Sequence, residues 1–229
     1  MTFLTRLPVG GMVNLDAADV ERAGTWFPIV GAALGGVCGE VARRAESPEL
    51  AILAGTLLTG ALHLDALADC ADARGVPTRQ RALEVMRDPR VGSFGVSAVV
   101  CDLMLKRAAL ARLADGQRSL RVGLATGALA RAVPVLLAAA LPDVRAGAGT
   151  ASALTRTGRG RAAGAAVLAT GIAAAALGRR GLGLAAWAMI GTGAGALGLR
   201  RWLGGVTGDA LGAMLELTET GLLTWAVRP

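Results

Sequence analysis

The sequence predicts an all-α protein of the polytopic membrane class, a helical bundle with about six to seven transmembrane helices. Hydrophobic residues make up 53% of the 229 residues, and the mean hydropathy is +0.52. Soluble domains have roughly 45–50% apolar residues. The chain holds 33 glycines but only three phenylalanines and no tyrosine. Because small residues let membrane helices approach closely, we expect residues 1–229 to form a single membrane-embedded domain.

Apolar runs, separated by arginine-rich or glycine-rich loops, mark where the spans are expected. A spanning helix needs roughly 20 apolar residues, and several runs are shorter, so the count of six or seven stays open. The runs are Phe27–Val41, Leu50–Leu64, Val91–Leu105, Val122–Leu141, Ala162–Leu177, Leu182–Leu199 and Ala210–Val227.

Charged residues or proline end most of these runs. The stops are, in chain order, Arg43–Arg44, the loop after Leu64, Lys106–Arg107, Pro142, Arg179–Arg180 and Arg200–Arg201. Before the first run, "NLDAADVERAGTWFP" has Asn14 or Asp16 as a helix cap and an amphipathic pattern, which is typical of a helix on the membrane surface. A slight excess of basic residues on the N-terminal side favours a cytoplasmic N-terminus.

The net charge of +7 comes almost entirely from arginine. The arginines flank apolar runs instead of following one polar face, which favours membrane flanks over nucleic-acid binding. Cys38, Cys70 and Cys101 have no metal-binding spacing and resemble small buried hydrophobes, so a structural zinc site is not expected. The first residues lack the pattern of a cleavable signal peptide.

The stretch "HLDALADCADA" places three aspartates at the end of an apolar run. Asp65, Asp69 and Asp72 are spaced so that a helix presents them on one face. Three anions there repel each other unless a cation neutralises them, and carboxylate oxygens suit Mg²⁺. A solvated acidic helix end is the alternative, but Ala, Leu and Cys between the aspartates fit it poorly. His63, the only histidine, points away from the aspartate face, so a catalytic role and a packing role both stay open.

A second motif, "MRDPRVGSFGVSA", precedes the third run. Asp88 adds a fourth carboxylate, and Arg87 and Arg90 can donate to phosphate oxygens. Gly92 and Gly95 permit close backbone approach. A plain loop between two helices is the alternative.

Further candidates lie in the second half of the chain. In "TGDALGAMLELTE", Asp209 and Glu216 fall on one helix face with Glu219. Thr207 or Asp209 can cap this helix, and a capping role is enough to explain the presence of Asp209. It does not explain Glu216, because acidic residues within membrane helices are costly. Arg131, inside an apolar run, needs an anionic partner or a watery cavity. Arg145, on a glycine-rich loop, is a candidate phosphate contact.

Three of these segments should meet at one membrane face. With alternating spans, the acidic motif, the segment before the third run and the segment before the last run all lie on the N-terminal side. Carboxylates, arginines and glycines at one surface suit metal-assisted transfer at a phosphate or diphosphate. The chain has no P-loop.

Several segments together resemble the cobalamin synthase family. They are "FLTRLPVG" at Phe3–Gly10, "FPIVGAALGG" at Phe27–Gly36, "HLDALADCADA" at His63–Ala73, "MRDPRVGSFG" at Met86–Gly95 and "TGDALGAMLELTE" at Thr207–Glu219, with "LPDVRAGAG" at Leu141–Gly149 as a weaker match. The order spans essentially the whole chain. Ala66 and Ala73 stand where the family usually has glycine, which puts local backbone geometry in question.

The resemblance implies a Mg²⁺-dependent membrane enzyme that joins adenosylcobinamide-GDP to α-ribazole, or its 5′-phosphate, and releases GMP. It implies a multi-pass protein of the bacterial cytoplasmic membrane with the site facing the cytoplasm. Its partners would be these substrates and lipid; nucleic acid is not expected, and a homo-oligomer or contact with other corrinoid-pathway enzymes stays open.

Carried onto this chain, the resemblance implies roles for the candidate residues. The metal ligands would be Asp65, Asp69, Asp72 and Asp88. Asp69 or Asp72 would be the base, and His63 is a further catalytic candidate. Substrate contacts would come from Arg87, Arg90, Arg131, Arg145, Asp209 and Glu216.

Two other functions compete with this one. A CDP-alcohol phosphotransferase of lipid synthesis would need an Ala-Arg pair and later aspartates that "DALADCADA" lacks. A transporter could use Glu216, Arg131 and the aspartates as a binding path, but we find no inverted repeat of interrupted spans.

Overall fold

Helices account for nearly all regular structure in the computed structural model, which describes residues 21–113, 117–145 and 150–228. The elements are η1 (Gly24–Trp26), α2 (Phe27–Ala45), α3 (Pro48–Thr59), α4 (Leu62–Arg74), α5 (Arg79–Val85), α6 (Ser93–Ala111), α7 (Arg118–Ala140), α8 (Thr150–Thr155), α9 (Arg159–Leu177), α10 (Arg179–Trp202) and α11 (Gly208–Ala226). The segment "FLTRLPVG", the first seven residues of the expected surface helix (14–20) and the end of "LPDVRAGAG" lie outside the described residues.

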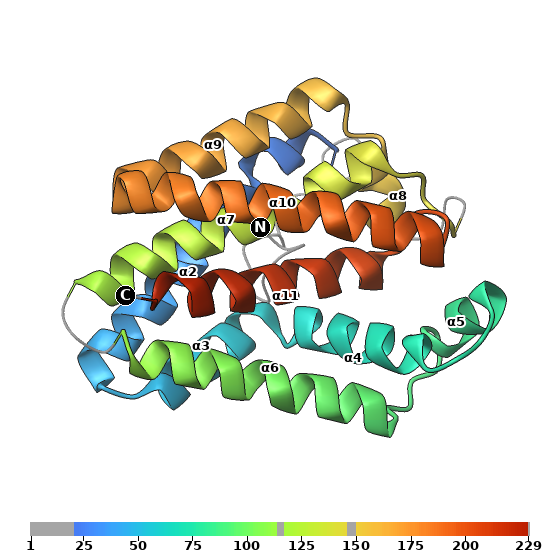
Figure 1. Ribbon diagram of the computed structural model, residues 1–229, viewed down its shortest axis with the longest axis horizontal. Coiled ribbons are helices and arrows are strands. Elements are labelled where there is room, and N and C mark those ends of the chain that lie inside the picture. Colours follow the sequence, from blue (N-terminus) through green and yellow to red (C-terminus); the bar gives the residue numbers. More distant parts are fainter. Residues whose placement is uncertain (1–20, 114–116, 146–149, 229) are drawn as a thin grey trace, which may run out of the picture.

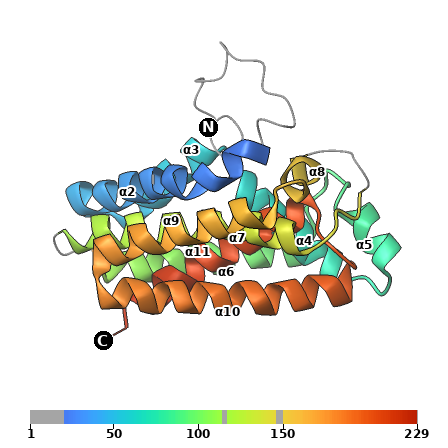
Figure 2. The ribbon, with the colours of Figure 1, turned by 90° about the horizontal axis from the view of Figure 1, so that it is seen from above.

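The long helices run along the long axis of the bundle (Figure 1). α7 is the central helix and contacts α2, α9, α10 and α11. Seen from above, α2 and α3 lie on one side of α7 and α11, and α10 lies on the other (Figure 2). α9 and α10 are mostly exposed along their apolar windows, so they present their side chains to lipid.

Among the described residues, four helical segments are long and apolar enough to cross a membrane, and a bent helix pair would make a fifth. The four are Glu21–Ala45, α7, α9 and α10. With the bent pair counted, the predicted count of six is reached if α6 or α11 also crosses, and seven if both cross. Both helices lie along the bundle, and most of their charged residues turn inward, as described below.

The apolar run Leu50–Leu64, expected as one helix, is broken in the structure. α3 and α4 meet at an 89° bend. Gly60 and Ala61 both have left-handed backbone angles there, with φ of 64° and 59°. Glycine adopts this conformation readily and commonly ends helices. The bend allows α4 to continue toward the end of the bundle where the candidate site lies.

α2 and α7 pack through glycines. A Cβ atom added at Gly31 or Gly35 would collide with the backbone carbonyl of Gly127 or Gly123 on α7. Reciprocally, the carbonyl of Gly35 fills the space next to Gly123. This is the small-residue packing by which membrane helices associate, and it explains part of the high glycine content.

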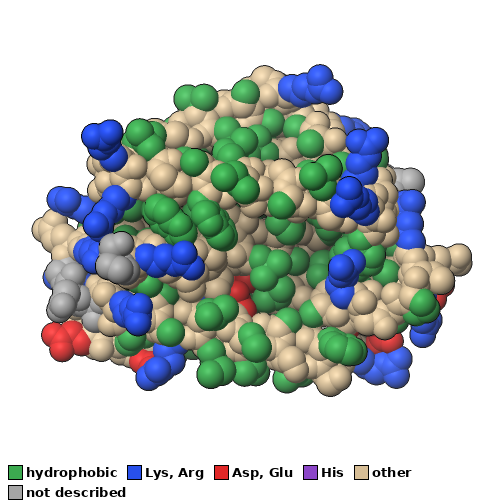
Figure 3. Space-filling model, viewed as in Figure 1, with side chains coloured by type: hydrophobic (Ala, Val, Ile, Leu, Met, Phe, Trp, Pro, Cys, Tyr) green, Lys and Arg blue, Asp and Glu red, His purple; other side chains and the backbone are tan. Residues whose placement is uncertain are grey.

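Lys and Arg side chains gather at the two ends of the bundle, with hydrophobic and uncharged side chains between them (Figure 3). This distribution matches a membrane lying across the middle of the bundle. The end that carries α5, the start of α6 and the start of α11 is called the site end below.

Candidate active site

The acidic face of α4 is less buried than its apolar face. Asp65 is exposed, and Asp69 and Asp72 are half-buried, whereas Ala66 and Cys70 are buried. α4 packs closely on α11 at Gly212. The gap there is too narrow for a side chain, since a Cβ added at Gly212 would lie 2.7 Å from the Ala66 Cβ. α4 is therefore held on α11 through its apolar face, and its aspartates lie near the site end of the bundle.

Asp72 binds the start of α6. Its two carboxylate oxygens accept hydrogen bonds from the backbone N–H groups of Gly92, at 2.7 Å, and Gly95, at 2.8 Å. The first N–H groups of a helix lack partners within the helix, so a carboxylate there satisfies them and complements the helix dipole. A Cβ at Gly92 or Gly95 would lie 2.6 or 2.5 Å from an Asp72 oxygen. The glycines of this motif therefore make room for Asp72.

Asp88 pairs with Arg90 at the surface. The Arg90 side chain donates to both Asp88 oxygens, at 2.9 and 2.6 Å. The Arg90 guanidinium and backbone N–H lower the pKa of Asp88 to about 2. Arg87 is exposed nearby in the sequence. Asp88 was predicted as a metal ligand, and its role in metal binding stays a prediction.

Arg145 and Asp209 form an ion pair between the 142–145 loop and α11. The Arg145 Nη2 atom lies 2.8 Å from Asp209 Oδ2. The loop is fixed by a parallel bridge at Asp143 and Val206. Val144 N–H donates to the Val206 carbonyl at 3.0 Å, and Val206 N–H donates to the Pro142 carbonyl at 2.9 Å. Thr207 caps α11 by accepting from Ala210 N at 3.0 Å, so Asp209 is not needed as the cap.

Asp69 is the point where these segments meet. It lies within electrostatic range of Asp65 and Asp72 on its own helix and of Asp209 and Arg145 from elsewhere in the chain. The predicted convergence of the acidic motif and the "TGD" segment is therefore confirmed by the fold. The resulting group of Asp65, Asp69, Asp209 and Arg145 is called the acidic site below.

The donor chemistry of the acidic site fits a divalent cation. Asp65 and Asp69 are one helical turn apart on α4, and Asp209 of α11 lies within electrostatic range of both. Carboxylate oxygens are the ligands that Mg²⁺ prefers. Within residues 21–113, 117–145 and 150–228, however, no three His, Cys, Asp or Glu side chains are gathered closely enough to hold an ion. Magnesium binding therefore stays a prediction.

A second polar cluster lies deeper in the bundle and is called the ion network here. It consists of Asp102 and Lys106 on α6, Arg131 on α7, and Glu216 and Glu219 on α11. Lys106 pairs with Glu216 and lies 3.5 Å from Asp102. Arg131 pairs with Glu219. Thr220 donates to Asp102 at 2.5 Å.

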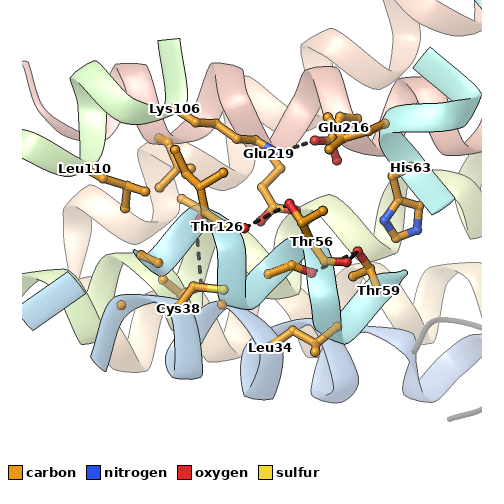
Figure 4. A pocket seen from close by; sticks show the side chains of 18 of the residues that line it. Leu34, Cys38, Thr56, Thr59, His63, Lys106, Leu110, Thr126, Glu216 and Glu219 are labelled. Atoms are coloured by element: carbon orange, nitrogen blue, oxygen red, sulfur yellow. Dashed lines mark hydrogen bonds and ion pairs between the residues drawn. The ribbon is translucent and has the colours of Figure 1, made fainter. Parts of the chain in front are cut away.

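The ion network borders a cavity of about 70 Å³. Lys106, Glu216 and Glu219 lie on one side of it, and Thr56 and Thr59 of α3 lie on the other (Figure 4). His63 is 5% exposed and lines the end of the cavity. A water occupies about 30 Å³ in the liquid, so the cavity has room for a few waters.

Two predicted substrate contacts belong to this network instead of the acidic site. Arg131 was expected to need an anionic partner, and Glu219 is that partner. Glu216 follows Asp209 by seven residues, which places it about 10 Å further along α11 at 1.5 Å per residue. Contact of either residue with substrate stays a prediction.

Lys106 is the residue that sequence reasoning missed. The sequence predicts that the third run stops at Lys106, but α6 continues to Ala111 and Lys106 points into the bundle. Asp102 was missed as well. One signal was present, since Lys106 is the only lysine among 24 basic residues. A long flexible ammonium in place of arginine suggests a specific interior position.

Comparison with known proteins gives one consistent result. The family model described as cobalamin-5-phosphate synthase matches residues 1–227. A protein of Chlorobium chlorochromatii named adenosylcobinamide-GDP ribazoletransferase is 38% identical, over 96% of this chain and 90% of that protein. Relatives of the same name from Prosthecochloris aestuarii and Vibrio cholerae are 38% and 34% identical, over 98% and 96% of this chain and 94% and 88% of their own lengths. No solved structure matches the chain.

Proposed function

The chain belongs to the cobalamin-5-phosphate synthase family, and we propose on this premise that it is an adenosylcobinamide-GDP ribazoletransferase. It transfers the adenosylcobinamide-phosphate group of adenosylcobinamide-GDP to α-ribazole or α-ribazole 5′-phosphate. The products are GMP and adenosylcobalamin or its 5′-phosphate. The relatives described above match nearly the whole chain, and all of them carry this name. These matches do not favour a lipid phosphotransferase or a transporter.

The observation that carries the mechanism is the meeting of Asp69 with the Arg145–Asp209 pair at the site end. An oxygen of the ribazole ribose attacks the cobinamide-side phosphorus of the diphosphate. The new O–P bond forms as the bond from that phosphorus to the bridging oxygen breaks, and GMP leaves with that oxygen.

The residues of the acidic site have different roles in the reaction. Asp69 accepts the proton of the attacking hydroxyl, since both oxygens of Asp72 already accept from backbone N–H groups. Arg145 binds a phosphate oxygen and neutralises its charge. Asp65 and Asp209 would hold the magnesium ion, which when bound supplies further positive charge to the diphosphate.

We further propose that the protein lies in the bacterial cytoplasmic membrane with the acidic site facing the cytoplasm. The apolar helices support the membrane location, and the slight excess of basic residues on the N-terminal side supports this orientation. Both substrates are water-soluble and would reach the site from that compartment.

Purified protein in detergent tests the proposal. Adenosylcobinamide-GDP, α-ribazole and Mg²⁺ are mixed with the protein, and GMP and adenosylcobalamin are followed by mass. Both products should appear, and a chelator should suppress them. Asp69→Asn should lower the rate by roughly 10²-fold or more, the scale of general-base catalysis.

Glu84→Gln is the matched control. Glu84 is an exposed carboxylate at the site end that pairs with Arg81 and lies outside the acidic site. It should leave the rate unchanged. Folded wild-type protein that forms neither product would overturn the proposed function, and an active Asp69→Asn protein would overturn only the role of Asp69.

A further inference from the structure

An apolar groove of about 330 Å³ lies between α4, α10 and α11, away from the acidic face of α4. Figure 3 faces these helices and shows hydrophobic side chains gathered between them. The groove exists because several of its lining residues are small. The small residues are Ala71, Gly195, Gly198, Ala210 and Ala213; the larger ones are Leu67, Leu199, Met214 and Leu217.

The groove opens toward the region that lipid tails occupy. α10 is mostly exposed along its apolar window, and Leu217 on the rim of the groove is 50% exposed. A narrow apolar groove in such a surface excludes water and is filled best by a flexible hydrocarbon chain, since an unfilled gap forfeits dispersion contacts.

One end of the groove is basic. Arg74, in the last turn of α4, lines it, and its guanidinium carbon lies 4.9 Å from the centre of the Trp202 ring. Arg201 does not line the groove but is exposed in the last turn of α10, next in sequence to the lining residue Trp202. Within the described part of the chain, neither guanidinium has a carboxylate partner. Tryptophan and arginine are typical of the depth at which phospholipid headgroups lie.

We propose that this groove binds one acyl chain of an anionic phospholipid, with the headgroup phosphate on Arg74 and Arg201. A guanidinium matches the geometry of phosphate oxygens. The apolar length of the groove takes the chain, and the two arginines select the anionic headgroup. The site is separate from the transfer reaction, although Cys70 and Ala210 in its lining directly follow Asp69 and Asp209.

The first test is native mass spectrometry of the full chain in mild detergent, titrated with phosphatidylglycerol or with phosphatidylcholine of identical acyl chains. One phosphatidylglycerol should be retained per protein, more tightly than phosphatidylcholine. Each engaged arginine should contribute about fivefold, which corresponds to the roughly 1 kcal/mol per basic residue seen near anionic lipid surfaces. Equal retention of the two lipids would overturn the proposal.

Glycine variants on α10 test the groove itself. Gly198 lines the groove, and a Cβ added there meets nothing within 4 Å, so we choose Gly198→Leu to place an apolar side chain at the groove. Gly193 on the same helix is equally open but does not line the groove, which makes Gly193→Leu the control. Retention of phosphatidylglycerol should fall only in Gly198→Leu, at an unchanged melting temperature. Equal retention by both variants would overturn the proposal.

Arginine variants test the headgroup contact. Arg74→Gln and Arg201→Gln should each reduce the preference for phosphatidylglycerol, whereas Arg180→Gln at the opposite end of α10 should not. Arg201→Gln leaves the contact of Arg74 with Trp202 in place, so it separates lipid binding from local packing. If Gly198→Leu instead weakened α-ribazole binding and left lipid retention unchanged, the groove would be a substrate pocket and the lipid assignment would fail.

Discussion

At the scale of single residues, carboxylates of similar sequence context have different partners. Asp72 accepts from two backbone N–H groups, and Asp88 accepts from Arg90. Asp69 lies among the other charges of the acidic site. One cluster of aspartates thus contains both residues that hold the backbone and a residue available to react.

This difference predicts opposite effects of two substitutions. Asp72→Ala should lower the free energy of unfolding by about 1–3 kcal/mol, because the N–H groups at the start of α6 lose a charged acceptor. Asp69→Ala should abolish product formation with little change in stability. Thermal unfolding in detergent, measured beside the transfer assay, distinguishes them. An Asp72→Ala protein as stable as wild type would contradict the assigned role.

Lys106 provides a second prediction at this scale. Lys106→Met leaves Glu216 and Asp102 buried without their cation, and breaking a buried ion pair costs about 3–5 kcal/mol. The midpoint of thermal unfolding should therefore fall substantially.

The double variant Lys106→Met/Glu216→Gln is the control for Lys106. It removes both charges, so much of the lost stability should return. If the double variant is less stable than Lys106→Met alone, the charge pair is not what Lys106 contributes.

At the scale of elements, glycine has two separate uses. Between α2 and α7 it brings two backbones into contact, and at Gly60 it permits the left-handed turn that breaks the second apolar run. Composition alone cannot distinguish these uses, because both appear in the sequence as glycine within an apolar stretch.

Alanine substitutions should separate a packed glycine from an open one. Gly35→Ala places a Cβ against the Gly123 carbonyl and should destabilise the protein by about 1–3 kcal/mol, as overpacking does. At Gly171 on α9 a Cβ meets nothing within 4 Å, so Gly171→Ala should be neutral or slightly stabilising. Equal melting temperatures for the two variants would contradict the close contact of α2 and α7.

The α3–α4 break gives a further prediction. Ala61 has φ of 59°, which costs a non-glycine residue roughly 1–2 kcal/mol. Ala61→Gly should keep or raise the melting temperature, whereas Ala61→Val should lower it, because branching at Cβ makes a left-handed angle worse. A more stable Ala61→Val protein would show that the second span is continuous.

At the scale of the whole molecule, the sequence predicted the apolar helices well but not the partners of the charged side chains. The runs anticipated α2, α7, α9 and α10 because a helix needs a long apolar stretch whether it faces lipid, as α9 and α10 do, or the bundle interior, as α7 does. The partner of Arg131 lies 88 positions away and those of Asp72 lie 20 and 23 positions away. Such pairings depend on how helices are arranged, which periodicity does not encode.

Part of the acidic site was nevertheless predictable. Alternating spans place the acidic motif and the "TGD" segment on one side of the membrane, and the fold brings Asp69 and Asp209 together. The ion network was not predicted, because Lys106 ends an apolar run in the sequence but turns inward on a helix that continues to Ala111.

The ion network also has a consequence for how the protein is made. Lys106 and Arg131 are synthesised well before Glu216 and Glu219 on α11, which supply their charge partners. Until α11 arrives, Lys106 has only Asp102 of its own helix as a charge partner and Arg131 lacks Glu219, a state that the bilayer interior tolerates poorly. The early helices therefore remain an incomplete assembly until α11 is synthesised and packs against them.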